Sequence, residues 1–118
     1  MNTSHVILIL FVLLAAIGCT QSTSSTEEPQ WVKDLIADFT SEPVGNPPQS
    51  IWRYEYKSQI VYYVPAQCCD QYSTLYDANG DVICVPNGGI DGYGDGMCPD
   101  FSQERKNEML IWEDPRPR

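Results

Sequence analysis

Residues 51–64 read IWRYEYKSQIVYYV, and this stretch decides the fold that the sequence predicts. In residues 51–56, three aromatic side chains alternate with Arg53 and Glu55, which is the pattern of a strand whose two faces differ. The next residues suit a tight turn into a second strand over residues 60–64. The stretch therefore predicts an antiparallel hairpin whose aromatic side chains pair across the two strands.

Shorter signals predict the remaining elements. Apolar side chains recur at the spacing of one helical face, which predicts a helix upstream of the hairpin. Downstream, Asn79-Gly80 is a strong signal for a second hairpin, and the proline-rich tail is expected to fray. The predicted ranges are a helix at 29–40, strands at 73–77, 81–85 and 109–112, a helical turn at 101–107 and a frayed tail at 115–118. The predicted fold class is α+β: one N-terminal helix packed on an antiparallel sheet of four to five strands, disulfide-stapled.

The first 18 residues are interpreted as a lipoprotein signal peptide. Residues 6–17 form a run of 12 apolar residues, shorter than the roughly 20 that a membrane-spanning helix needs. The run ends in Ala16-Ile17-Gly18-Cys19, which resembles a lipobox, so Cys19 is predicted to carry acyl chains such as palmitate. Ala16 stands where Leu is usual, and the leader lacks the expected Lys or Arg. An ordinary secretory signal followed by a chance cysteine is the alternative.

Residues 19–29 are expected to form a polar tether between the lipid and one small domain at residues 30–114. This organisation predicts a protein of a bacterial cell envelope, anchored to a membrane on its extracytoplasmic side. The anchoring membrane would be the outer membrane where the source has one. Thr20 follows the anchor, and an Asp that can signal inner-membrane retention is not found there.

Charge and histidine content exclude several function classes. The formal net charge is −9, which makes nucleic acid a poor partner because phosphates need a basic surface. The single histidine is His5, inside the predicted signal peptide. The mature chain would therefore lack imidazole for Ser-His-Asp or Cys-His catalysis and for metal ligation. We expect a protein that is not an enzyme and that uses no cofactor.

The other four cysteines are expected to form two disulfides, since their number is even and the predicted compartment is oxidising. They are Cys68, Cys69, Cys84 and Cys98. Adjacent cysteines bond to each other only in a strained ring, so we expect Cys68 and Cys69 to bond outward, one to Cys84 and one to Cys98. A redox or metal site is the alternative, although adjacent cysteines lack the C-x-x-C spacing of thiol oxidoreductases.

A glycine-rich loop contains a weak calcium candidate. Asp91, Asp95 and Asp100 follow part of the spacing of a calcium-binding loop. Tyr93 and Ser102 occupy positions where that loop places acidic residues. The alternative is that glycines supply positive φ angles and aspartates bond nearby backbone N–H groups.

Aromatic residues are numerous for so small a domain. Most are expected to pack in the core, but an exposed subset could stack on sugars or receive a partner protein. The candidates are Trp52, Tyr54, Tyr62, Tyr63 and Tyr93. Because Tyr62 and Tyr63 are adjacent in a strand and face opposite ways, we expect at least one to lie on the solvent side.

Several motifs together resemble a family of small bacterial envelope lipoproteins that carry a single domain of unknown function. The motifs are WVKDLI at 31–36, SEPVGNPP at 41–48, RYEYK at 53–57, VYYVP at 61–65, QCCD at 67–70, LYD at 75–77, GDG at 94–96, CPDF at 98–101 and ERKNE at 104–108. The resemblance covers about residues 30–113 and implies no activity.

Three functions remain open from the sequence. The first is a non-catalytic binding or interaction module, whose partner is an envelope protein or a glycan. The second is an inhibitor of an extracytoplasmic enzyme, which would use the loops at 43–48 and 86–99. The third is a carboxylate-based hydrolase, for which Asp70, Asp77, Asp95 and Asp100 are candidates.

Overall fold

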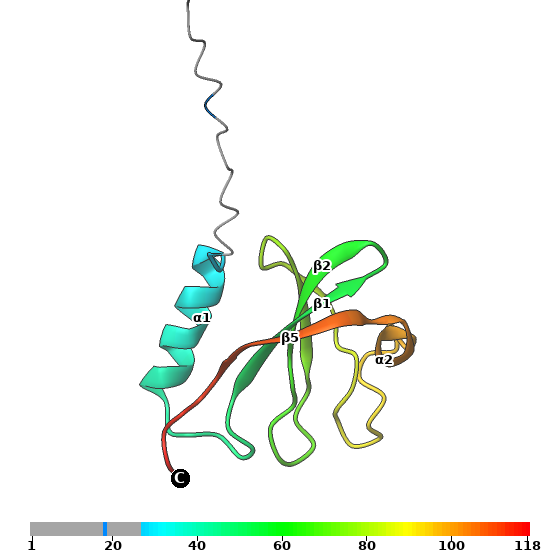
Figure 1. The fold of residues 1–118 in the computed structure, drawn as a ribbon. Coiled ribbons are helices and arrows are strands. Elements are labelled where there is room, and N and C mark those ends of the chain that lie inside the picture. The colour runs from blue at the N-terminus through cyan, green and yellow to red at the C-terminus, as the bar shows by residue number, and fades with distance from the viewer. Residues whose placement is uncertain (1–17, 19–26) are drawn as a thin grey trace, which may run out of the picture.

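The computed structural model describes residue 18 and residues 27–118, so the predicted signal peptide, Cys19 and most of the tether lie outside the described residues. The elements in chain order are α1 (Gln30–Ser41), β1 (Ser50–Tyr56), β2 (Gln59–Val64), β3 (Thr74–Asp77), β4 (Val82–Cys84), α2 (Phe101–Glu104) and β5 (Lys106–Glu113) (Figure 1). Within the described part of the chain, no helix is both long and apolar enough to cross a membrane.

The strands form one antiparallel sheet with the order β4-β3-β2-β1-β5. The predicted hairpin lies near its centre, where Trp52 of β1 lies opposite Tyr63 of β2. The α+β fold class is confirmed. Strand β5 begins at Lys106, earlier than predicted, because its first residues pair with β1 at the sheet edge while remaining exposed and polar. Apolar alternation could not reveal these edge residues.

Helix α1 covers one face of the sheet. Val32 of α1 is fully buried in a cluster with Ile51 and Tyr62. The Trp31 ring meets the Tyr62 ring edge to face at 5.1 Å between centroids, and its Nε1 donates to the carbonyl of Ala78 at 3.0 Å. Aromatic packing of this kind holds α1 against the strands and against the β3–β4 turn.

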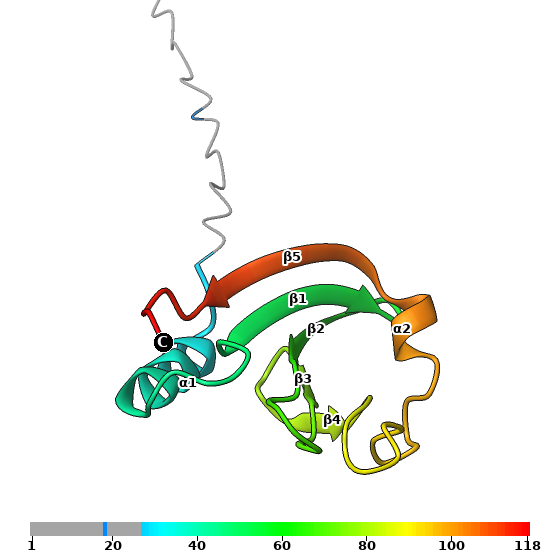
Figure 2. The same cartoon turned by 90° about the horizontal axis from the view of Figure 1, so that it is seen from below.

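The irregular chain that follows β4 covers the other face. Phe101, at the start of α2, is 1% exposed, and its ring lies 5.4–5.6 Å from the rings of Tyr54, Tyr56 and Tyr63. Figure 2 shows the curved sheet with α1 on one side and the loops leading to α2 on the other. The central strands β1 and β2 are therefore covered on both faces, whereas the edge strand β5 is largely exposed.

Burial on both faces contradicts the expectation for the adjacent tyrosines. Tyr62 is 4% exposed and Tyr63 is 8% exposed, so neither lies on a solvent side. Tyr62 packs under α1, whereas Tyr63 packs against Phe101. The covering layer on the Tyr63 side is Phe101 of the short helix α2 together with the irregular chain before it. The sequence predicts a helical turn at 101–107, but no local pattern indicates that Phe101 covers the sheet.

The disulfides are Cys68–Cys69 and Cys84–Cys98, so the expected outward bonding of Cys68 and Cys69 is wrong. Cys84 and Cys98 are buried in the cluster around Phe101, with their Cα atoms 6.2 Å apart. Cys68 and Cys69 are exposed in the loop between β2 and β3. The two pairs lie in different environments, and the buried cysteines are available only to each other.

The C-terminal tail differs from the frayed segment expected at 115–118. The Arg116 guanidinium donates two hydrogen bonds to the Asp114 carboxylate, at 2.7 and 3.0 Å. It also donates to the carbonyls of Phe39, Thr40 and Glu42 at the end of α1, at 2.9–3.2 Å. The Phe39 carbonyl also accepts from the Glu42 amide at 3.3 Å, so Arg116 adds to the C-terminal cap of α1. A cation is favourable at this end of the helix dipole.

We expect the Arg116→Gln variant to melt several degrees below the wild type at about pH 7, where it leaves a buried Asp114 carboxylate without its cation. Arg116 holds the pKa of Asp114 below its usual value, chiefly through hydrogen bonding. The stabilisation is therefore present above the unfolded-state pKa and is lost as the pH falls through the folded-state pKa. The difference in melting temperature should shrink at about pH 3.

The matched control is Arg118→Gln, because Arg118 makes one exposed hydrogen bond, to Asn46. This role of Arg116 would be contradicted if Arg116→Gln lowered the melting temperature no more than Arg118→Gln does. It would also be contradicted if the loss in melting temperature were the same at about pH 7 and at about pH 3.

Candidate functional site

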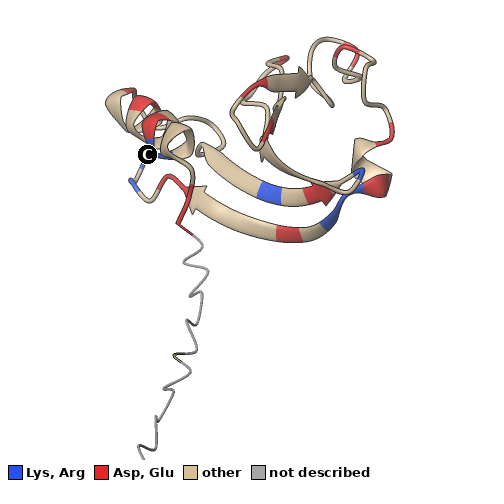
Figure 3. Ribbon diagram, turned by 90° about the horizontal axis from the view of Figure 1, so that it is seen from above, with Lys and Arg blue, Asp and Glu red and all other residues tan. Residues whose placement is uncertain are grey.

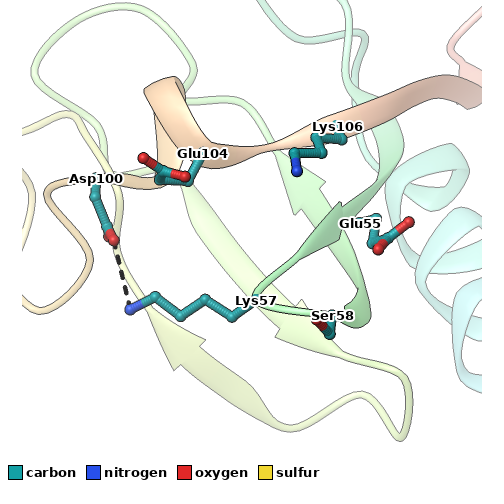
Figure 4. Close-up of a pocket in the computed structure, with 6 residues that line it drawn as sticks. All are labelled: Glu55, Lys57, Ser58, Asp100, Glu104 and Lys106. Carbon is teal, nitrogen blue, oxygen red and sulfur yellow. Dashed lines mark ion pairs between the residues drawn. The ribbon is translucent and has the colours of Figure 1, made fainter.

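A charged hollow of about 220 Å³ lies between the β1–β2 turn and the α2–β5 segment. Its lining residues are Glu55, Lys57, Ser58, Asp100, Glu104 and Lys106 (Figure 4). Lys57 and Ser58 form the turn with positive φ angles of 49° and 61°. That turn brings Lys57 toward Asp100, so acidic and basic groups from distant parts of the sequence share one surface.

Asp100 is held by two neighbours in this hollow. The Tyr56 hydroxyl donates to Asp100 Oδ1 at 2.6 Å, and Lys57 Nζ lies 3.5 Å from Asp100 Oδ2. The hydrogen bond from Tyr56, followed by the weaker effect of Lys57, lowers the pKa of Asp100. Burial and the same bond raise the pKa of Tyr56. Asp100 is thus held ionised, which does not suit the protonated acid of a carboxylate-based hydrolase.

Arg105 is partly buried beside this hollow and packs on the core. Its guanidinium lies over the Tyr54 ring at 4.7 Å and over the Phe101 ring at 5.4 Å. The Tyr54 hydroxyl donates to Glu108 at 2.6 Å, and burial together with this bond raises the pKa of Tyr54. These contacts satisfy the polar groups of Arg105 and Tyr54, so packing alone explains the positions of both side chains.

A second surface consists of apolar side chains on two loops. Tyr72 is 63% exposed, Ile90 94% and Tyr93 79%. We call these three residues the apolar loop surface. Backbone bridges join Gly88 to both Tyr72 and Tyr93, so the two tyrosines belong to one framework. The Tyr72 ring also packs on Gly89, where an added Cβ atom would lie 2.7 Å from a ring carbon.

The framework under this surface is closely hydrogen bonded. Ser73 is fully buried, and its N–H and hydroxyl both donate to the Asn87 carbonyl. The Asn87 side chain donates to the Tyr63 hydroxyl at 2.9 Å. Asp95 accepts from the amides of Val85 and Met97, and the Cys84–Cys98 disulfide closes the same segment. The loop is consequently tied to the core, although it contains no helix or strand.

The apolar loop surface lies at an acidic end of the molecule. Figure 1 shows the loops after β2 and β4 at the end of the sheet opposite the start of α1. Residues 65–100 contain six Asp and no Lys, Arg or His. Figure 3 shows Lys and Arg on β1, near the start of β5 and near the C-terminus, while the charged residues of these loops are all acidic. The surface therefore combines exposed apolar groups with negative charge.

The structure separates the five aromatic residues that the sequence offered as binding candidates. Tyr93 is exposed, Trp52 is partly buried, and Tyr54, Tyr62 and Tyr63 are buried. Sequence reasoning missed Tyr72 and Ile90. The sequence signal for Ile90 was weak: it is an isolated aliphatic residue in a loop rich in Gly and Asp. No periodic pattern there predicts that its side chain is buried.

The structure does not bring the three calcium candidates together. Asp91 accepts from the amide of Tyr93, Asp95 accepts from two other amides, and Asp100 binds Tyr56. Among residues 18 and 27–118, no group of three or more His, Cys, Asp or Glu side chains is placed to hold a metal ion. The first two aspartates make the turn-stabilising bonds that short acidic side chains commonly make.

Comparison with family models matches residues 37–114 to a domain of unknown function (DUF6970). No curated protein and no solved structure matches the chain. The matched segment begins within α1 and ends directly after β5, so it includes all five strands, both disulfides and the apolar loop surface.

We expect the Tyr56→Phe variant to raise the pKa of Asp100 toward its usual value, because it removes the hydroxyl that donates to the ionised carboxylate. A pH titration of the side-chain carboxyl resonances by NMR measures this. Tyr54→Phe is the control, since the Tyr54 hydroxyl binds Glu108. An unchanged Asp100 pKa in Tyr56→Phe would mean that another group holds the charge.

Proposed function

Because the chain belongs to the family of the domain of unknown function DUF6970, whose description names no activity, we propose a function from the surface of the domain. The protein is a lipid-anchored, non-catalytic interaction module of a bacterial cell envelope. Its apolar loop surface receives a partner protein.

The observation that carries this proposal is the exposure of Tyr72, Ile90 and Tyr93 on a hydrogen-bonded framework. Single exposed apolar residues are common on soluble proteins and need no explanation. Here three large side chains project from two loops that bridge each other, and the buried Cys84–Cys98 disulfide anchors one of them. A surface that is ordered before binding loses little conformational entropy when a partner docks.

The chemistry of the surface favours a protein over a glycan. Sugars stack on aromatic faces, but the most exposed side chain of the set is the aliphatic Ile90. Tyrosine beside an aliphatic anchor is typical of protein interfaces. The acidic surroundings, which include Asp91 and Asp95, favour a partner patch that is apolar at its centre and bordered by Lys and Arg.

The predicted lipid anchor fits this arrangement. Cys19 precedes α1, and the apolar loop surface lies at the end of the sheet opposite the start of α1 (Figure 1). A tether on the α1 side leaves the loops free to face away from the membrane. The negative charge of the domain also disfavours contact with an anionic lipid surface.

An inhibitor of an extracytoplasmic enzyme is the second candidate, and one observation favours it. Ile90 projects from a loop enclosed by the Cys84–Cys98 disulfide, and a cross-linked loop with an exposed anchor suits insertion into an active-site cleft. The two candidates differ in one measurement. A partner enzyme loses activity on binding an inhibitor, and it keeps its activity on binding a non-inhibitory module.

We expect Cys19 to be acylated. Cells fed an alkyne-labelled palmitate should incorporate the label into the protein, and the Cys19→Ser variant should lose both the label and its place in the membrane fraction. Cys68→Ser/Cys69→Ser is the control, and it should keep both. A labelled Cys19→Ser protein, or an unlabelled wild type in the membrane fraction, would contradict the anchor.

We expect a photo-reactive amino acid at position 90 to cross-link one protein in intact cells, whereas the same probe at position 109 should not. Met109 is a matched control because it is 49% exposed but lies on β5 at the opposite edge of the sheet. The identified partner is then purified and titrated against the wild type, Ile90→Asp and Met109→Asp. Loss of a central apolar anchor should weaken binding by about tenfold or more, and Met109→Asp should bind as the wild type does.

Rising salt should also weaken the wild-type complex, because the proposed partner patch is basic. The proposal would be contradicted if Ile90→Asp bound the partner as tightly as the wild type does. It would also be contradicted if the surface bound a glycan and no partner protein.

A further inference from the structure

The two disulfides differ sharply in their access to solvent. Cys84 is 1% exposed and Cys98 is 4% exposed, and both lie in the cluster around Phe101. Cys68 and Cys69 are exposed in the loop between β2 and β3. Thiol–disulfide exchange requires a thiolate to reach a disulfide sulfur, so a reductant can reach one pair without disturbing the other.

We infer that Cys68–Cys69 is a site of reversible thiol–disulfide exchange with a dithiol reductant, and that its reduction loosens the apolar loop surface. A thiolate of the reductant attacks one sulfur of the pair, forms a mixed disulfide and displaces the other sulfur as a thiolate. The second thiol of the reductant then attacks the mixed disulfide and releases both cysteines as thiols. Two electrons and two protons pass to the pair, and the reductant leaves as its own disulfide.

The fold does not depend on the Cys68–Cys69 bond. That bond joins residues one position apart, whereas Cys84–Cys98 closes a segment with a sequence separation of 14. A cross-link stabilises mainly by restricting the unfolded chain, and an enclosed loop of this minimal length restricts it little. Reduction of Cys68–Cys69 should therefore leave the core and the melting temperature nearly unchanged.

The loop that contains the pair is hydrogen bonded to the loop that carries Ile90 and Tyr93. The Cys68 amide donates to the Asn46 carbonyl, and the Gln71 carbonyl accepts from the Gly89 amide at 3.2 Å. Tyr72 follows directly and bridges Gly88. Freeing the two cysteines adds backbone freedom two residues before the Gln71–Gly89 contact, while the buried Ser73 remains anchored to Asn87.

Selective reduction is tested by titrating the folded protein with dithiothreitol, alkylating free thiols and locating them by mass spectrometry. Cys68 and Cys69 should become alkylated at a reductant concentration about tenfold or more below that required for Cys84 and Cys98. Removal of the reductant and mild oxidation should restore the bond. Simultaneous reduction of both pairs, or earlier reduction of Cys84–Cys98, would overturn the inference.

The effect on the surface is tested by amide hydrogen exchange of the selectively reduced protein. The Gly89 amide should exchange severalfold faster after reduction, whereas the Ser73 amide should keep its protection. Cys68→Ser/Cys69→Ser is the matched control: its Gly89 amide should exchange fast with or without reductant. Unchanged Gly89 exchange in the reduced wild type would refute the coupling. These measurements need no partner, so they can contradict the redox inference while the proposed function stands. Failure to find a partner would likewise leave the redox inference standing.

Discussion

Burial of the β1–β2 hairpin on both faces is the constraint on which the rest of the structure depends. Adjacent residues of a strand face opposite ways, so Tyr62 and Tyr63 need two separate covering layers. Helix α1 supplies one layer through Trp31 and Val32. The other layer is Phe101 of the short helix α2 with Cys98 of the irregular chain before it, and Cys98 is bonded to Cys84 of β4. The buried Cys84–Cys98 disulfide adds a covalent link between this second layer and the sheet.

The same constraint explains which parts of the fold the sequence could predict. Helix α1 and the two hairpins have periodic or turn signals in their own residues, and they appear where those signals predicted them. For the second covering layer the sequence predicts only a helical turn at 101–107, and a single aromatic residue after a Gly-rich loop does not show that Phe101 packs on the sheet. The alternation of the strand alone therefore predicts that at least one of Tyr62 and Tyr63 faces solvent, and the structure buries both. Predicting this layer requires knowledge of long-range contacts, and the periodicity of a sequence contains no information about such contacts.

The candidate site follows a similar logic. Aromatic identity alone could not separate the buried Tyr54 from the exposed Tyr93, since exposure depends on which loop covers which strand. Cysteine number correctly indicated cross-links, but the outward bonding of Cys68 and Cys69 required Cys84 or Cys98 to be within reach. Both of those residues are bonded to each other in the core around Phe101. The turn chemistry of Asp91 and Asp95 was readable from the sequence, because their hydrogen bonds are local.

The two disulfides have different effects on the loops. A small domain has few apolar residues to spare for its surface, since its core is barely large enough to be stable. Cys84–Cys98 fixes the loop covalently, so Ile90 and Tyr93 are not needed to hold it by burial and can project into solvent. Cys68–Cys69 encloses almost no chain, and burial does not protect it. The Cys68–Cys69 bond therefore adds little to stability, and the core does not need the neighbouring apolar loop surface. Both features are explained better by a function than by a contribution to folding.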